Sequence, residues 1–205
     1  MRLTVTTFVT LDGVYQAPGG PSEDDEGGFR HGGWSFPYAD EDSGAVIVEW
    51  ITKAGAFLLG RKTYDIFVSY WPKVTDPADP IASRLNALPK YVVSGNKPPL
   101  DWHDSHLVTG DVPAEIAKLK QLPGGELQVH GSGNLVRTLI RHGLADEYQL
   151  LVYPVILGTG KRLFPDADIA AALRLTGSKT TGKGVQILTY EPAGPAQYGS
   201  FALEE

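Results

Sequence analysis

The residues with the clearest chemical potential form a glycine-rich turn, Gly131-Ser132-Gly133-Asn134-Leu135, between an apolar segment and a helical pattern. Leu127 and Val129 alternate with polar residues before the turn, as in a strand, and apolar residues recur at helical spacing after it. The free N–H groups in the first turn of a helix carry the positive end of its dipole, so they bind anions well. The turn therefore predicts a phosphate site, although a tight connection without a ligand gives the same pattern.

Two further polar turns follow buried runs elsewhere in the chain. Gly60-Arg61-Lys62-Thr63 comes after one run, and Ser94-Gly95-Asn96-Lys97 comes after another. Ligands of α/β sheets bind beyond the carboxyl ends of the strands, where such turns lie. A helix N-terminus suits a pyrophosphate and an arginine suits a phosphate monoester, so the three turns together predict a site for a molecule that carries both.

The histidines favour no metal site. His103 and His106 lie among aspartates in a polar loop, so we interpret them as exposed side chains and expect no bound metal. His130 directly precedes the phosphate turn, where it either lines a ligand groove or belongs to the core. No Gly-x-Ser-x-Gly motif is present to indicate a serine hydrolase.

The composition is that of a globular protein without cysteine chemistry. The 205 residues carry a net charge of −6 and contain no basic run, which argues against a nucleic-acid surface. The absence of cysteine excludes disulfides, thiolate nucleophiles and zinc–thiolate sites. The N-terminus does not resemble a signal peptide and no apolar run has transmembrane length, so we expect a cytoplasmic protein without a membrane partner.

A long loop between Gln16 and Asp40 combines glycines and prolines with the acidic run Glu23-Asp24-Asp25-Glu26. Loops of this length in compact domains are usually functional or disordered. Its far part contains four aromatic residues, Phe29, Trp34, Phe36 and Tyr38. Two interpretations stay open: a lid in which Trp34, Phe36 and Tyr38 bind a flat substrate ring, or a loop whose aromatic residues dock onto the core or a partner subunit.

Strand and helix patterns alternate along the rest of the chain. The expected strands cover residues 3–9, 56–59, 91–93, 106–109, 127–129, 147–156, 173–179 and 185–190, and the expected helices cover 43–54, 63–70, 80–88, 113–122 and 135–142. This order predicts an α/β fold with a central mixed, mostly parallel sheet, flanking helices and a C-terminal antiparallel hairpin. We expect one domain, residues 1–192, and a C-terminal tail, residues 193–205.

The order of these motifs resembles the dihydrofolate reductase-like superfamily, and within it the branch that includes the reductase domain of bacterial riboflavin biosynthesis. The resemblance covers about Met1 to Pro192. It rests on these segments: Leu11-Asp12-Gly13, Leu59-Gly60-Arg61-Lys62-Thr63-Tyr64, Tyr91-Val92-Val93-Ser94, Val129-His130-Gly131-Ser132-Gly133-Asn134-Leu135, and Pro154-Val155-Ile156-Leu157-Gly158-Thr159-Gly160 with Leu163-Phe164.

The resemblance implies NADPH as the cofactor and a homodimer as the assembly. It places Gly60, Arg61 and Thr63 at the adenosine phosphate and pyrophosphate, and Ser94 at the 2′-phosphate. It places Gly131 to Leu135 at the pyrophosphate, with Val9 and Thr10 beside the nicotinamide.

Two carboxylates are candidates for the proton donor. Folate reductases carry a carboxylate at the start of the first helix, where this chain has Asp40-Glu41-Asp42 in a different sequence context. Asp12, after the first strand, is the second candidate, and a turn-capping role beside Gly13 explains it equally well. Either group would need shielding from water to raise its pKa toward neutrality.

These features predict an NADPH-dependent oxidoreductase that transfers hydride to a C=N or C=O bond of a small heterocyclic or sugar-derived substrate. One alternative is a riboflavin-pathway reductase of a phosphorylated ribosylamino-pyrimidine. Another is a non-catalytic NADPH-binding or ligand-sensing module, which would keep the fold but lack the acid.

Overall fold

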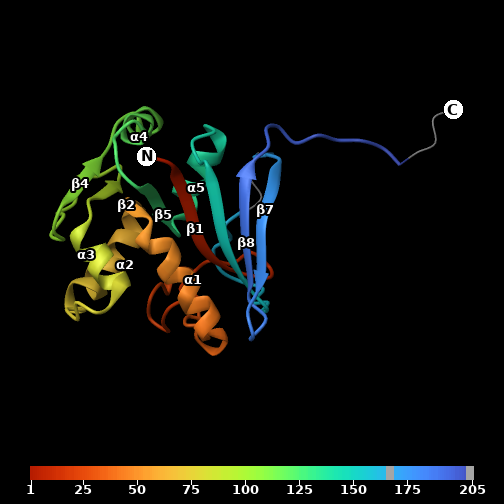
Figure 1. Ribbon diagram of the computed structural model, residues 1–205, viewed down its shortest axis with the longest axis horizontal. Coiled ribbons are helices and arrows are strands. Elements are labelled where there is room, and N and C mark those ends of the chain that lie inside the picture. The colour runs from red at the N-terminus through yellow and green to blue at the C-terminus, as the bar shows by residue number, and fades with distance from the viewer. Residues whose placement is uncertain (165–168, 202–205) are drawn as a thin grey trace.

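An eight-stranded sheet forms the centre of the protein in the computed structural model, which describes residues 1–164 and 169–201. The strand order is β4-β3-β2-β5-β1-β6-β8-β7 (Figure 1). The strands are β1 (Leu3–Thr10), β2 (Ala54–Gly60), β3 (Lys90–Val93), β4 (Ser105–Val108), β5 (Glu126–His130), β6 (Glu147–Tyr153), β7 (Leu173–Thr180) and β8 (Gln186–Pro192). Neighbours from β4 to β6 pair in parallel, whereas β8 pairs antiparallel with both β6 and β7. The predicted fold class, including the terminal hairpin, is confirmed.

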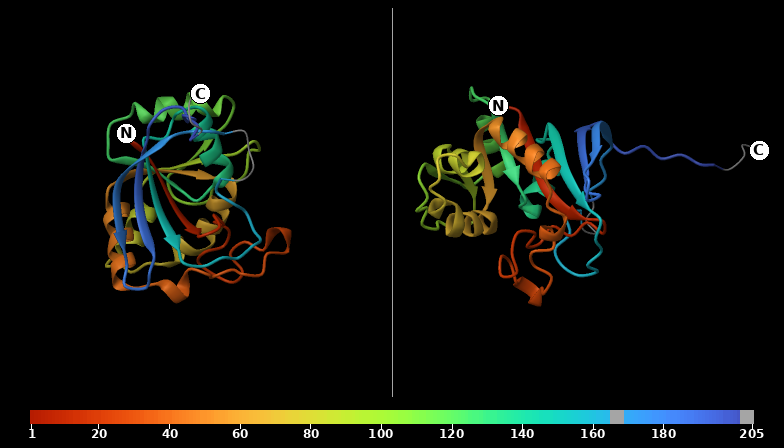
Figure 2. Two further views of the ribbon diagram at one scale, coloured as in Figure 1. Left: turned by 90° about the vertical axis from the view of Figure 1, so that its right-hand side faces the viewer. Right: turned by 60° about the horizontal axis from the view of Figure 1, so that its bottom comes forward.

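Helices cover both faces of the sheet (Figure 2). Alternate residues of β2 face opposite sides: Phe57 packs in a cluster with residues of α1, α2 and α3, whereas Leu58 packs with residues of α4 and α5. Burial on both faces explains the continuous apolar run of this strand. The helices are α1 (Glu41–Thr52), α2 (Arg61–Tyr70), α3 (Pro80–Ala87), α4 (Val112–Lys120) and α5 (Gly133–Arg141), with 3-10 helices η1 (Glu26–Gly28), η2 (Phe36–Tyr38) and η3 (Trp71–Lys73).

The first helix begins earlier than its apolar pattern indicated. The sequence favoured Ser43 as the N-cap, but α1 starts at Glu41 because Asp40 caps it. The Asp40 carboxylate accepts a hydrogen bond from the Ser43 amide at 2.8 Å, and the Ser43 hydroxyl accepts one from the Asp40 amide at 3.1 Å. The apolar pattern therefore predicted where the helix lies, whereas the pair of hydrogen bonds between Asp40 and Ser43 determines where it starts.

The carboxyl ends of the parallel strands lie at one edge of the sheet, the lower edge in Figure 1. The loop between β1 and α1 passes along this edge, as the right-hand view of Figure 2 shows. All three predicted phosphate turns also leave the sheet here, because they follow β2, β3 and β5. The fold thus brings segments up to about 70 residues apart in the chain to one edge.

The last described residues extend away from the sheet (Figure 1). Tyr198 and Phe201 are exposed there, and residues 202–205 of the predicted tail lie outside the described part. Leu173 and Leu175 of the edge strand β7 are also exposed. The homodimer and the limits of the domain stay predictions. In residues 1–164 and 169–201, no helix combines the length and apolar character needed to cross a membrane.

Candidate functional site

One large groove opens at the carboxyl edge of the sheet. Its volume is about 1830 Å³, well above the roughly 300–1,000 Å³ of pockets that hold one small ligand. The three predicted turns line it through Gly60–Thr63, Ser94–Asn96 and Gly131–Leu135. We call this part, together with Lys161 and Arg162, the polar end of the groove. The prediction that the turns meet at one site is consistent with this arrangement.

Ser132 joins two of the turns. Its hydroxyl accepts a hydrogen bond from the Gly60 amide at 2.9 Å, lies 2.8 Å from Thr63 Oγ1, and donates to the His130 carbonyl at 3.2 Å. A Cβ atom on Gly60 would lie only 3.0 Å from this hydroxyl, so glycine permits the close approach. Ser132 occupies the N-cap position of α5, but its side chain makes no capping hydrogen bond because it is committed to the neighbouring turn.

The turn before α5 uses left-handed backbone at two successive residues. Gly131 has φ +55° and Ser132 has φ +60°, a conformation that costs a serine free energy. The hydrogen bonds of the Ser132 side chain offset that cost. This conformation leaves the first amides of α5 at the groove wall, where they have no helical carbonyl partner.

Tyr15 lies against the N-terminus of α5. Its phenolic oxygen accepts a hydrogen bond from the Gly133 amide, and burial raises the pKa of its hydroxyl. The tyrosine ring is so close that a Cβ atom on Gly133 would lie 2.7 Å from it. The hydroxyl proton of Tyr15 can still be donated to an anion held by the neighbouring amides.

One face of α2 forms a wall along the whole groove. Thr63, Ile66, Phe67 and Tyr70 recur at spacings of three and four residues, and all four line the groove. Nine residues separate Arg61 from Tyr70, which corresponds to roughly 14 Å along the helix axis. The groove therefore has a polar end at the start of α2 and a second, different end near its last turn.

Arg61 and Lys62 already have acidic partners. Arg61 Nε pairs with Asp65 at 2.7 Å, which leaves the other guanidinium nitrogens available to a ligand. Lys62 Nζ lies 3.4 Å from Asp24 and 3.7 Å from Glu26, two residues of the long loop. Among the predicted cofactor contacts, Arg61 is thus the cation better placed to bind a phosphate.

An ion network holds the acidic half of the loop over the groove. Lys161 Nζ lies 2.7 Å from both Asp24 and Glu26, while Lys62 approaches the same carboxylates from α2. Burial raises the pKa of Asp24, but its hydrogen bonds with Lys161 and with the Glu26 amide outweigh burial and lower it. Asp24 is therefore ionised at neutral pH.

The two predicted proton donors are committed to structural contacts. Asp12 accepts hydrogen bonds from the Thr10 hydroxyl at 2.6 Å and the Gly158 amide at 2.9 Å. Burial raises the pKa of Asp12, but these bonds and one from the Leu157 amide outweigh burial and lower it to about 2. Asp12 lies outside the groove lining, so its placement favours the turn-capping alternative.

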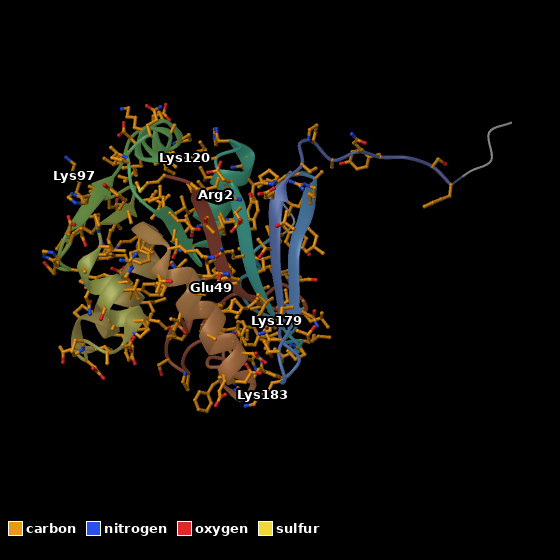
Figure 3. The ribbon with its side chains drawn as sticks, in the orientation of Figure 1. Arg2, Glu49, Lys97, Lys120, Lys179 and Lys183 are labelled. Carbon is orange, nitrogen blue, oxygen red and sulfur yellow. The ribbon has the colours of Figure 1, made fainter. Side chains whose placement is uncertain are left out.

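Asp40 also lies outside the groove lining. Hydrogen bonds, above all from the Ser43 amide, lower the pKa of Asp40 to about 2. The β7–β8 hairpin meets this end of α1: the Lys183 amide donates to Asp40 at 3.0 Å, and Lys179 pairs with Asp42 at 2.8 Å (Figure 3). The carboxylate therefore anchors the hairpin and caps the helix.

Glu23 is a carboxyl group that does line the groove. It accepts hydrogen bonds from the amides of Gly19 and Gly20, and burial raises its pKa despite them. The sequence placed Glu23 in an acidic run and gave no sign that it would differ from its neighbours. The raised pKa of Glu23 arises from burial, which only the folded loop creates.

The aromatic half of the loop packs away from the groove. Trp34 is 6% exposed, donates its indole N–H to the Gln16 carbonyl at 2.7 Å, and packs edge-on against Tyr153. Tyr38 lies beside the same ring, and Phe36 is exposed. None of the three lines the groove, and the structure favours the alternative in which the loop docks onto the core for Trp34 and Tyr38, whereas Phe36 is exposed to solvent.

Near the end of β1, the residues that line the groove lie two positions before Val9 and Thr10, the pair expected beside the nicotinamide. Val9 is in the core and the Thr10 hydroxyl binds Asp12, whereas Thr7 and Phe8 line the groove. Pairing of β1 with β5 ends at Thr6, whose carbonyl accepts from the Gly131 amide, while pairing with β6 continues to Thr10. Main-chain groups of alternate strand residues point to the same side. The N–H and C=O of Phe8 therefore face the side that β5 has left open.

The far part of the groove is built from helices, and we call it the apolar end. Its lining residues from α1, from α2 after Thr63, from η3 and from α3 are Ile47, Trp50, Ile51, Ile66, Phe67, Ser69, Tyr70, Trp71, Ile81 and Leu85. Among the residues that the structure describes, none of the groove lining contributed by these segments is charged. The sequence pattern assigned all of these side chains except Trp71 to expected helices and none of them to a site.

His130 lies where the two ends meet. Its ring packs beside Phe57 and Phe67, with centroids 5.6 and 6.2 Å away, and Nε2 lies 3.3 Å from Gln128 Oε1. Burial lowers the pKa of His130 to about 4, so the ring is neutral at physiological pH. Both sequence interpretations hold in part, because the ring is packed and also lines the groove.

Several polar groove residues were missed because they precede or follow the recognised motifs. Tyr15 follows the first strand, Arg137 lies one turn into α5, and Lys161 and Arg162 follow the Gly158-Thr159-Gly160 motif. Arg137 lay within helical reach of the phosphate turn, so its spacing was a usable signal. For Tyr15 no comparable signal exists in the sequence.

Comparison with known proteins gives consistent relationships. Residues 2–187 match the family described as the RibD C-terminal domain. The uncharacterized protein YyaP of Bacillus subtilis is 29% identical over 191 residues, which cover 92% of this chain and 94% of YyaP. A putative riboflavin biosynthesis protein from Shewanella sp. PV-4 has a similar structure, with a TM-score of 0.71 and 21% identity over 94% of this chain and 99% of that one. Dihydrofolate reductase from Enterococcus faecalis, complexed with NADP(H), gives a TM-score of 0.56 at 14% identity, over 94% and 96% of the two chains.

Proposed function

Since this chain belongs to the RibD C-terminal domain family, we propose that it is a reductase that uses NADPH to reduce a C=N or C=O bond of a small molecule. The observation that carries the proposal is the meeting of three strand-end turns in one groove of about 1830 Å³. That volume accommodates a dinucleotide and a second molecule, rather than one small ligand. The complex of the Enterococcus dihydrofolate reductase with NADP(H) supports the choice of cofactor.

The residues of the polar end fit such a cofactor. The first amides of α5 and the Tyr15 hydroxyl would bind the pyrophosphate, because both are donors at the positive end of a helix. Arg61, with Thr63 and Ser94 near it along the groove, would bind the 2′-phosphate side. Gly131 has no Cβ atom, which leaves this cradle open, and its left-handed backbone favours glycine at the position.

The open edge of β1 suits the other end of the cofactor. Phe8 offers one main-chain donor and one acceptor side by side, which is the complement of a primary carboxamide such as that of nicotinamide. When bound, NADPH supplies hydride to the substrate. The protein then positions the two molecules, excludes water with the loop held by Lys62 and Lys161, and presents Glu23 as a proton donor.

A non-catalytic ligand-sensing module is the second candidate. It is favoured by the commitment of Asp12 and Asp40 to structural hydrogen bonds, which removes both carboxylates predicted from the sequence. The two candidates share the cofactor site and differ in turnover. Loss of NADPH absorbance with a panel of quinones, aldehydes, imines and pterins separates them, because a sensing module leaves NADPH unoxidised.

Cofactor selectivity provides the decisive experiment. Isothermal titration of the purified protein with NADPH and NADH should show tighter binding of NADPH. Arg61→Gln should weaken NADPH binding about 10- to 100-fold, because a charge-assisted contact with the 2′-phosphate is lost, and should leave NADH binding nearly unchanged.

Arg141→Gln is the matched control, because Arg141 is an exposed arginine in the last turn of α5, outside the groove lining. Equal losses for NADPH and NADH in the Arg61 variant would overturn the placement of the 2′-phosphate. If neither nucleotide binds at micromolar concentration, the reductase proposal itself fails.

A further inference from the structure

The apolar end differs from the polar end in its charges. The cations of the groove lining are Arg61, Lys62, Arg137, Lys161 and Arg162, and they come from the turns and from the first two turns of α5. In the described part of the chain, the segments α1, η3 and α3 contribute only uncharged lining residues. A phosphate or carboxylate placed beside Ile47 of α1 and Leu85 of α3 would therefore lose its water without gaining a cation from these helices.

The neutral state of His130 extends this property to the junction of the two ends. Packing against Phe57 and Phe67 shields the imidazole ring on one side, while the ring also lines the groove. Because the ring stays uncharged, it offers no positive charge to an anionic substrate. The nearest cation of the α2 wall, Lys62, lies one turn before Ile66 but is paired with Asp24 and Glu26 of the loop.

The tryptophans supply an independent observation. Trp34 and Trp102 donate their indole N–H groups to protein acceptors, the Gln16 carbonyl at 2.7 Å and Asn86 Oδ1 at 3.0 Å. Trp50 and Trp71 line the groove, and within residues 1–164 and 169–201 neither indole N–H has an acceptor. The two unpaired donors thus coincide with the apolar end.

Trp50 is the more informative of these two residues because it is only 6% exposed. Buried indole N–H groups usually have a partner, and an indole can only donate. The Trp50 nitrogen is not sealed inside the protein, since it is absent from the set of fully buried, unpartnered atoms that includes Thr7 Oγ1. The acceptor of this N–H therefore comes from the groove, where a ligand carbonyl can replace water.

We propose that the apolar end binds an uncharged, planar carbonyl compound, and that the indole N–H of Trp50 donates a hydrogen bond to its carbonyl oxygen. The flat ring of such a compound packs against Phe67 and Trp71, and Ile47 and Ile51 close the other side. This inference deepens the proposed function and rests on it for the reaction, because hydride transfer needs the cofactor. It separates this chain from a reductase of phosphorylated substrates, whose phosphate would have no cation here.

A matched pair of probes tests the charge requirement. 1,4-Naphthoquinone and 1,4-naphthoquinone-2-sulfonate share a planar dicarbonyl ring and differ by one anionic group. The chain contains no cysteine, so the quinone cannot arylate a thiol. Calorimetric titration of the NADP⁺-loaded protein, which cannot reduce either compound, should show the neutral quinone binding at least about 10-fold more tightly. Equal binding, or tighter binding of the sulfonate, overturns the proposal.

Variants test the hydrogen bond. Trp50→Phe keeps an aromatic ring and removes the donor, so naphthoquinone affinity should fall about fivefold while the affinity for naphthalene, which has no acceptor, stays the same. Trp34→Phe is the control, because Trp34 does not line the groove and its indole N–H is already paired with the Gln16 carbonyl. Equal losses for naphthoquinone and naphthalene in the Trp50 variant would refute the assigned donor.

Titrating the quinones into the protein without nucleotide keeps the two proposals distinguishable. Selective binding of the neutral quinone to a protein that does not bind NADP⁺ would support the apolar end and overturn the proposed function. Binding of NADP⁺ by a protein that shows no preference between the quinones would support the proposed function and overturn the assignment of the apolar end.

Discussion

The two ends of the groove are built in opposite ways. The polar end consists of turns, each made by consecutive residues such as Gly60–Thr63 and Gly131–Leu135, and it carries the cations of the groove. The apolar end consists of side chains from three helices that are distant in sequence and contribute no charge there among the described residues. The comparison teaches that a site for phosphates can be local, because main-chain amides and glycines act over a few residues. A site for an apolar ring has to be assembled.

The largest expected effect concerns the source of the proton. Glu23→Gln should lower kcat about 100-fold for the first substrate found, because it removes the groove carboxyl whose pKa burial raises, while Gln can still accept from the Gly19 and Gly20 amides. Asp40→Asn is the control: kcat should stay close to wild type, whereas the melting temperature should fall slightly, because the asparagine side chain has one oxygen and cannot accept from both the Ser43 and the Lys183 amides. Steady-state rates by NADPH absorbance provide the measurement. A slow Asp40 variant beside an unchanged Glu23 variant would restore the donor predicted from the sequence.

The next effect tests whether the polar end depends on its local backbone. Gly131→Ala introduces a Cβ atom at φ +55° in the groove and should weaken NADPH binding on the order of 50-fold. Gly143→Ala introduces the same strain at φ +59°, at the opposite end of α5, with no neighbouring atom within 4 Å. Both variants should lower the melting temperature, and only the first should change the titration with NADPH. Similar affinities in the two variants would show that the turn is merely a tight connection.

The smallest effect tests whether His130, where the two ends of the groove meet, is shielded from water. Burial lowers the pKa of His130 from 6.5 to about 4 in the folded protein. Below pH 6.5 the unfolded chain binds a proton at this histidine that the folded protein does not bind, so the folded state loses stability as the pH falls from 6.5 toward 4. The free energy of unfolding should therefore decrease by about 2 kcal/mol more in wild type than in His130→Gln between pH 7.5 and pH 4. Urea unfolding at both pH values gives the difference, and other acidic groups cancel because both proteins carry them. Parallel pH dependence of the two proteins would show that the ring is accessible to water.

The sequence by itself determined the features that depend on neighbouring residues. Apolar periodicity located the strands and helices, and the glycine turns indicated the polar end and the family. It also left open the two alternatives that the structure favours, the capping role of Asp12 and the docking of Trp34 and Tyr38 onto the core. These properties follow from local backbone preferences, which a few consecutive residues express.

Only the tertiary structure decided which side chains share the groove. It separated Glu23 from Asp12 and Asp40, because burial in one case and hydrogen bonds in the others move carboxyl pKa values in opposite directions. It also gathered Ile47, Trp50 and Phe67 into the apolar end, although each of them reads as an ordinary core residue in its own helix. The physical reason is that burial, desolvation and the pairing of donors with acceptors are properties of neighbours in space, and a parallel sheet makes neighbours of segments far apart in the chain.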